Sequence, residues 1–116
     1  MDDLDPTYTD PDRYKTIFEN DRVRVLDYRD TPGAKTKPHR HPNSVLLTLS
    51  DFRRRLTVGE DVKEVALETG RALWRAAETH TGENNYGYTR RLRRAERLTQ
   101  RVPAPRRSAP MVAPAG

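Results

Sequence analysis

The stretch that decides the fold is GAKTKPHRH, residues 33–41. Pro38 favours extended backbone just before His39, so the two histidines of the stretch are predicted to lie on a strand. Successive side chains of a strand point to opposite faces, which places His39 and His41 on the same face. Two imidazoles at this spacing can bind one metal ion together. We therefore interpret the pair as part of a metal site.

The sequence on either side of this stretch predicts further strands. Residues 22–28 alternate in polarity, which is typical of a strand with one buried face. Residues 44–49 (SVLLTL) are apolar at nearly every position and predict a central strand buried on both faces. Residues 53–58 and 62–67 flank a short loop at residues 59–61 and predict a hairpin. Short strands separated by turn residues indicate an all-β sandwich or barrel.

The third and last histidine of the chain is His80, which follows a turn at Gly70 and a predicted strand at residues 72–74. A β-sandwich can bring that part of the chain back beside residues 39–41. The sequence contains no cysteine, which excludes disulfides, thiolate metal ligands and a cysteine nucleophile.

Two stretches of the sequence resemble the two motifs of cupins. Residues 33–41 match the start of the first motif, G-x5-H-x-H-x3–4-E-x6-G. Residues 70–84 (GRALWRAAETHTGEN) match a variant of the second, G-x5-P-x-G-x2-H-x3-N. From about residue 12 to residue 84 the chain is similar to small bacterial single-domain cupins.

The resemblance implies a jelly roll, or double-stranded β-helix, with a divalent metal ion between its two sheets. Carried over residue by residue, the metal ligands are His39, His41 and His80. Asn84 closes the second motif and is expected to line the pocket. The glutamate of the first motif is replaced, because Val45 and Leu46 stand at its place. What remains is a neutral three-histidine site with open coordination positions, compatible with Fe, Zn, Ni, Mn or Cu.

Four further residues lie close to His80 in the sequence. Glu78 has the same strand parity as His80 and is either a further ligand or base, or a solvated turn residue. Trp74 has that parity too and is predicted to point inward, as a pocket wall or as an ordinary core aromatic. Arg71 and Arg75 are candidates for holding a substrate carboxylate, although surface arginine is the preferred interpretation.

Such a site leaves two functions open. The first is a metal-dependent enzyme, dioxygenase-like or an isomerase, that acts on a small organic molecule. The second is a non-catalytic module that binds a small molecule or a metal. Thiol dioxygenases also rely on an outer-sphere histidine, and the lack of a fourth histidine disfavours that chemistry. Nucleic-acid binding is disfavoured as well, because the basic end of the chain has almost no aromatic residues to stack on bases.

The positive charge of the chain is concentrated at its C-terminus. Residues 87–116 hold eight arginines and one acidic residue, a balance of +7, whereas the whole chain carries +5. We predict an extended lead-in at residues 1–12, a cupin domain at 13–88 and an Arg/Pro-rich tail at 89–116, irregular, partly helical or disordered. The run Arg53–Arg55 is predicted to lie on an edge strand or to face solvent, where it would block edge pairing.

Residues 89–98 (TRRLRRAERL) stand where similar cupins have their last strand. Four arginines within Arg90–Arg94 predict that this segment cannot be a buried strand, because each buried charge would need a partner. Two interpretations follow. A change of reading frame in the coding DNA has replaced the native strand, or the segment is a basic helix with an apolar stripe of Leu92, Ala95 and Leu98.

Partners and compartment follow from the surface and the chain ends. A jelly roll this short has apolar surface to cover, so we expect a homodimer that pairs through the outer sheet and binds a small-molecule ligand. No apolar run approaches the roughly 20 residues that cross a membrane. The acidic N-terminus lacks the pattern of a secretory signal, which favours a cytoplasmic protein.

Overall fold

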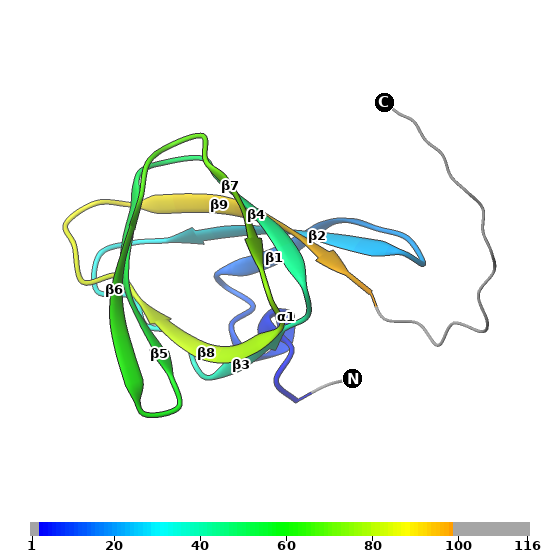
Figure 1. The fold of residues 1–116 in the computed structure, drawn as a ribbon, viewed down its shortest axis with the longest axis horizontal. Coiled ribbons are helices and arrows are strands. Elements are labelled where there is room, and N and C mark those ends of the chain that lie inside the picture. The colour runs from blue at the N-terminus through cyan, green and yellow to red at the C-terminus, as the bar shows by residue number, and fades with distance from the viewer. Residues whose placement is uncertain (1–2, 99–116) are drawn as a thin grey trace.

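The computed structural model of the protein describes residues 3–98, which form two antiparallel sheets that face each other (Figure 1). The elements are α1 (Pro6–Thr9), β1 (Tyr14–Glu19), β2 (Val23–Asp30), β3 (His39–His41), β4 (Ser44–Thr48), β5 (Phe52–Val58), β6 (Asp61–Leu67), β7 (Ala72–Arg75), β8 (Glu78–Glu83) and β9 (Arg90–Arg97). The five-stranded sheet has the order β1-β2-β9-β4-β7 and the four-stranded sheet the order β3-β8-β5-β6. The predicted all-β jelly roll is confirmed.

The apolar core lies between the sheets. It consists of Tyr14, Leu26, Tyr28, Leu46, Phe52 and Leu92, with Leu67 packed against it. The rings of Tyr28 and Phe52 meet across the interior, with their centroids 6.1 Å apart. The strands alternate inward and outward residues, so the inner faces of both sheets meet in this core.

β9 occupies the middle of the five-stranded sheet, where β2 and β4 pair with it on its two sides. Its side chains alternate, and the inward, buried ones are Arg90, Leu92, Arg94 and Glu96. The predictions of a tail or a helix at residues 90–97 are therefore wrong. A buried arginine is tolerated because Asp30, opposite Arg90 in the register, supplies the partner that we expected to be absent. The reading-frame hypothesis loses its premise, and residues 99–116 lie outside the described residues.

Two predictions about strand faces are also corrected. β4 is buried on one face only, since Val45 and Leu47 are 45% and 40% exposed. In β5, Arg54 is buried while Arg53 and Arg55 are exposed, so the run does not face solvent as a whole. β3 and β6, not β5, are the edge strands of this sheet.

The N-terminal segment is folded rather than extended along residues 5–10. Asp5 caps α1 by accepting a hydrogen bond from Thr7 N at 2.9 Å. Asp10 is buried and accepts a hydrogen bond from the backbone N–H of Lys37 at 3.0 Å. These contacts hold the segment against the chain that leads into β3. No helix within residues 3–98 is long and apolar enough to cross a membrane.

Candidate metal centre

The three histidines meet in the interior, at neighbouring strands of the four-stranded sheet. β3 and β8 pair antiparallel with His39 directly opposite His80, and His41 lies two residues further along β3. The ring centroids are 4.8 to 5.0 Å apart, and one nitrogen from each ring lies within 4.8 Å of the others. All three side chains are at least 97% buried. The structure thus brings together the residues that the spacing singled out.

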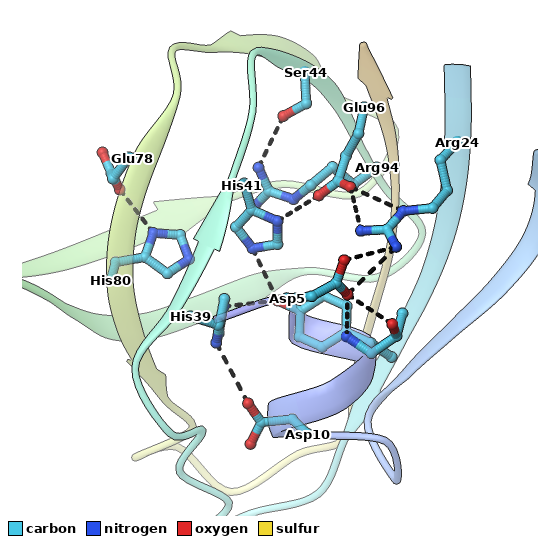
Figure 2. Close-up of polar contacts among 12 residues, drawn as sticks. Asp5, Asp10, Arg24, His39, His41, Ser44, Glu78, His80, Arg94 and Glu96 are labelled. Carbon is cyan, nitrogen blue, oxygen red and sulfur yellow. Dashed lines mark hydrogen bonds and ion pairs between the residues drawn. The ribbon is translucent and has the colours of Figure 1, made fainter. Parts of the chain in front are cut away.

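Each imidazole has an oxygen at the same ring nitrogen, Nδ1. Figure 2 shows Glu96 at His41, Glu78 at His80 and, 3.4 Å from Nδ1 of His39, the carboxylate of Asp10. The Nδ1 contacts are with Lys37 O for His39 (2.9 Å), Glu96 Oε2 for His41 (2.6 Å) and Glu78 Oε2 for His80 (2.7 Å). A neutral imidazole that donates from Nδ1 keeps its lone pair on Nε2. Proteins orient metal-ligating histidines in this way. The three rings therefore offer three Nε2 lone pairs to one site.

The Nε2 atoms have weak partners or none. Tyr14 places its hydroxyl oxygen 3.4 Å from Nε2 of both His39 and His41. Nε2 of His80 is buried and has no hydrogen-bond partner. A buried polar atom without a partner carries a free-energy cost that a bound ion removes. Three neutral imidazoles are a donor set that fits a divalent transition metal and leaves further coordination positions open.

The surroundings keep these histidines unprotonated. Burial lowers the pKa of His41 and His80, and the positive charges of Arg94 and Arg54 lower it further. Burial also lowers the pKa of His39, although the carbonyl of Lys37 opposes the shift. A metal binds only the unprotonated ring, so low pKa values leave the ligands ready at neutral pH. Tyr14 remains a phenol, because burial raises its pKa to about 12.

Glu96 connects the site to the surface. Its carboxylate accepts from His41 and from Arg24, whose Nη2 lies 2.8 Å from Oε1. Arg24 in turn pairs with Asp5 at 3.0 Å. Burial raises the pKa of Glu96, while the hydrogen bond and charge of Arg24 oppose this shift. The sequence analysis missed Glu96, which lies in the segment interpreted as a tail, and it also missed Tyr14.

The other candidate residues are not with the converging nitrogens. Glu78 contacts Nδ1 of His80 and is also paired with Arg75 at 3.1 Å, so its position is that of an orienting group. Trp74 is 62% exposed on the outer face of the five-stranded sheet, and the prediction that it points inward is wrong. Arg71 lies on a separate surface pocket, with Arg53 and Tyr86 among its lining residues.

Asn84 has a structural position. It is fully buried, and its side-chain amide donates to Asp30 Oδ1 and to Tyr88 O, both at 2.9 Å. Its carbonyl oxygen accepts from the backbone N–H of Tyr86 at 3.1 Å. Asn84 therefore fixes the connection between β8 and β9, and these contacts satisfy its polar atoms without a ligand.

Comparisons with known proteins agree on the fold. None of the protein-family models matches the sequence, and none of the curated proteins does. A cupin domain from Bordetella pertussis Tohama I superimposes with a TM-score of 0.70 at 23% identity, over 74% of this chain and 92% of that one. A double-stranded β-helix protein from Klebsiella pneumoniae gives 0.57 at 15% identity, over 71% and 72% of the two chains. The polyketide cyclase RemF from Streptomyces resistomycificus gives 0.55 at 20% identity, over 72% and 63%. The protein is a small domain with the cupin fold.

Proposed function

We propose that this protein binds one divalent transition-metal ion through His39, His41 and His80 and acts on a small organic molecule at that ion. The observation that carries the proposal is the common orientation of the three rings. Every Nδ1 is committed to an oxygen, and every Nε2 is left for a ligand. Three histidines placed for packing alone would not need the same nitrogen free in each ring.

The residues around the histidines support chemistry rather than storage. The bound ion would supply a Lewis acid or, in the case of iron, a site for dioxygenase-like chemistry with the open positions taken by substrate and O₂. The hydroxyl of Tyr14 lies beside two of the ligand nitrogens and keeps its proton at neutral pH. It is therefore placed to donate a hydrogen bond to a molecule bound at the ion. The pairing of Glu96 with Arg24 keeps His41 in one orientation while this happens.

Metal analysis of the protein and of alanine variants tests the ion. Wild type should hold about one equivalent of Fe, Zn, Ni, Mn or Cu, and His39→Ala, His41→Ala and His80→Ala should each lose most of it, because two neutral ligands hold an ion weakly. Tyr14→Phe is the matched control, since it changes the surroundings of the site and keeps all three ligands. Full occupancy in His80→Ala would overturn the three-histidine site. Binding without O₂ uptake or substrate turnover across a substrate panel would leave the non-catalytic module as the function.

A second copy of the chain is the partner that we propose for the outer face of the five-stranded sheet. The strand registers place five apolar side chains in one row across all five strands: Phe18, Val25, Ala95, Val45 and Trp74. Phe18, Val45 and Trp74 are between 45% and 62% exposed. A row of this kind matches itself about a two-fold axis. The adjoining row carries opposite charges on Asp27 and Arg93. When two copies meet across this face, Asp27 of one copy can therefore lie near Arg93 of the other.

A further inference from the structure

Two buried arginines on the inner face of β9 are partnered differently. Arg90 donates from Nε to Asp30 Oδ1 at 2.9 Å, from Nη2 to Asp30 Oδ2, and from Nη1 to Arg53 O at 2.7 Å. Arg94 donates from Nη1 to Ser44 Oγ at 3.0 Å (Figure 2), while its Nε and Nη2 are buried without a partner. Its side chain is 1% exposed, so these two nitrogens are shielded from bulk solvent.

The register explains why Arg94 lacks an acid. Asp30 of β2 stands opposite Arg90, but Leu26 of β2 and Leu46 of β4 stand on the two sides of Arg94. The unpartnered edge of the Arg94 guanidinium is formed by Nε and Nη2. Arg90, on the same strand, uses the same two nitrogens to bind the carboxylate of Asp30. This edge offers two parallel N–H groups that match the two oxygens of a carboxylate.

A second guanidinium lies on the facing sheet. Arg54 is 4% exposed, and its Nε has no hydrogen-bond partner. Its Nη1 lies 3.5 Å from the point where a Cβ on Gly82 would be, and Gly82 follows His80 by two residues on the same face of β8. Burial, together with the nearby charge of Arg94, lowers the pKa of Arg54 to about 10. Both cations thus lie close to the histidines and to each other.

In the described part of the chain, two of the buried cations near the histidines lack an ion pair, while the buried carboxylate of Asp10 lies 3.4 Å from Nδ1 of His39. Arg90 is paired with Asp30, and Glu96 is paired with Arg24. Arg54 and Arg94 form no ion pair with any carboxylate in residues 3–98. A buried guanidinium without a paired acceptor is unfavourable, and a divalent ion on the histidines would add positive charge nearby. An anion bound beside the histidines would supply the acceptor that these two arginines lack.

We propose that the molecule bound at the metal centre is a small organic carboxylate, with its carboxylate on the unpartnered edge of Arg94 and within reach of Arg54. The inference deepens the function proposed above and rests on it for the ion, but the two arginines are in place whether or not an ion is bound. The carboxylate can therefore be tested separately from the metal.

The probes are acetate, pyruvate and benzoate, with acetamide as the neutral analogue and sulfate and phosphate as inorganic oxyanions. Each is titrated at constant ionic strength into metal-free and Co(II)-loaded full-length protein, and melting temperature and calorimetric affinity are recorded. At least one carboxylate should raise the melting temperature in both forms, and acetamide should not. In the Co(II) form the visible spectrum should change as the carboxylate molecule reaches the ion. Stabilisation by sulfate or phosphate alone, or by none of the probes, would overturn the proposal.

Variants assign the binding to the arginines. Arg94→Met should weaken carboxylate binding at least about tenfold, because two charge-assisted hydrogen bonds are lost, and without ligand it should melt no lower than wild type. Arg94→Lys keeps the charge in the core and should also bind more weakly, since it lacks the two-pronged edge. Arg53→Met, at the exposed neighbour of Arg54, is the matched control and should bind like wild type.

The remaining outcomes separate the two proposals. Unchanged binding in both Arg94 variants would overturn the carboxylate site. Metal content is measured on the same samples: a protein that responds to carboxylates but takes up no metal refutes the ion and keeps the anion site. A protein that takes up metal but responds to no carboxylate refutes the anion site alone.

Discussion

The two ends of β9 each bury an arginine, but they differ in whether its polar atoms have partners. At the Arg90 end, a buried guanidinium is enclosed by Asp30, Tyr28 and a backbone carbonyl, and Asn84 completes the network with three hydrogen bonds of its own. At the Arg94 end, polar atoms of Arg94 and His80 have no acceptor or donor. Both ends are equally buried, so exposure to water does not account for the difference.

This difference supports the proposals above, in which one end of β9 serves the fold and the other serves a ligand. A fully paired network stabilises one arrangement of the chain and needs nothing more. Unpaired buried groups are costly to folding, and a bound ion, water or ligand can complete them. The Arg90 end is therefore structural, and the histidine end is where we propose that an ion and a ligand bind.

The largest expected effect concerns the paired end. Arg90→Met leaves Asp30 as an uncompensated buried charge and should reduce the free energy of unfolding by about 3 to 5 kcal/mol. Arg91→Met, at the next residue and facing outward, should change it by less than about 0.5 kcal/mol. Urea denaturation measures both. If Arg94→Met reduced the free energy of unfolding as much as Arg90→Met, the two ends of β9 would not differ in the way argued above.

Lowering the pH should destabilise the metal-free protein because of its buried histidines. The pKa values of His41 and His80 are lower in the folded chain than the unfolded value of about 6.5. As the pH falls below that value, these two histidines become protonated in the unfolded chain but stay neutral in the folded chain. The free energy of unfolding therefore decreases as the pH falls. The two residues together should cost about 2.5 kcal/mol between about pH 7 and about pH 5.5.

Unfolding by urea at a series of pH values, with a chelator present, checks this. Glu96 titrates with the opposite sign because its pKa is raised, so a Glu96→Gln background removes that contribution while keeping an acceptor for Nδ1 of His41. His80→Gln in that background should remove about half of the slope. A flat profile would mean that the rings take up protons in the folded state, which contradicts their neutral form.

The histidine cluster could be predicted from the sequence because the pattern that identifies it involves residues close together in the chain. A spacing of two residues places His39 and His41 on one face whatever the partner strand is, and the resemblance of residues 70–84 to a variant of the second motif located His80. The arginines of β9 were misjudged because their environment is not local. Arg90 meets an acid 60 residues away in the chain, and Glu96 meets His41 across 55 residues.

The faces of the outer strands were misjudged for another reason. Val45 was expected inside because it is apolar, and Trp74 because it shares the parity of His80, yet both lie on the outside of the sheet. Hydrophobicity alone does not tell which face of a strand is buried when both faces carry apolar residues. Only the register, which follows from long-range pairing, decides it.

A smaller effect should separate the ligands from the groups that hold them. Glu78 contacts Nδ1 of His80, so Glu78→Ala should weaken metal binding by about 10- to 100-fold, as loss of such an orienting contact generally does. Glu78→Gln keeps an acceptor for Nδ1 and should cost less. Metal titration against a chromogenic chelator measures both, with the exposed Glu64→Gln as control. Equal losses in the Ala and Gln variants would instead make Glu78 a ligand.

The smallest expected effect on the site comes from the outer face of the sheet. Ala95 belongs to the exposed apolar row and lies between Arg94 and Glu96, so a second copy seated on this row would back the histidine end of β9 and not the Arg90 end. Val45→Ser and Trp74→Ser should each raise the dimer dissociation constant at least about tenfold, with metal affinity unchanged. Val62→Ser is the matched control, because Val62 is 57% exposed on β6 of the other sheet.

Light scattering over micromolar concentrations gives the mass of the particle. Hydrogen exchange shows whether residues 93–97 lose protection on dissociation while residues 90–91 do not. A wild-type mass of one chain throughout that range would overturn the dimer, and equal loss of protection along all of β9 would show that the partner supports the whole strand rather than its histidine end.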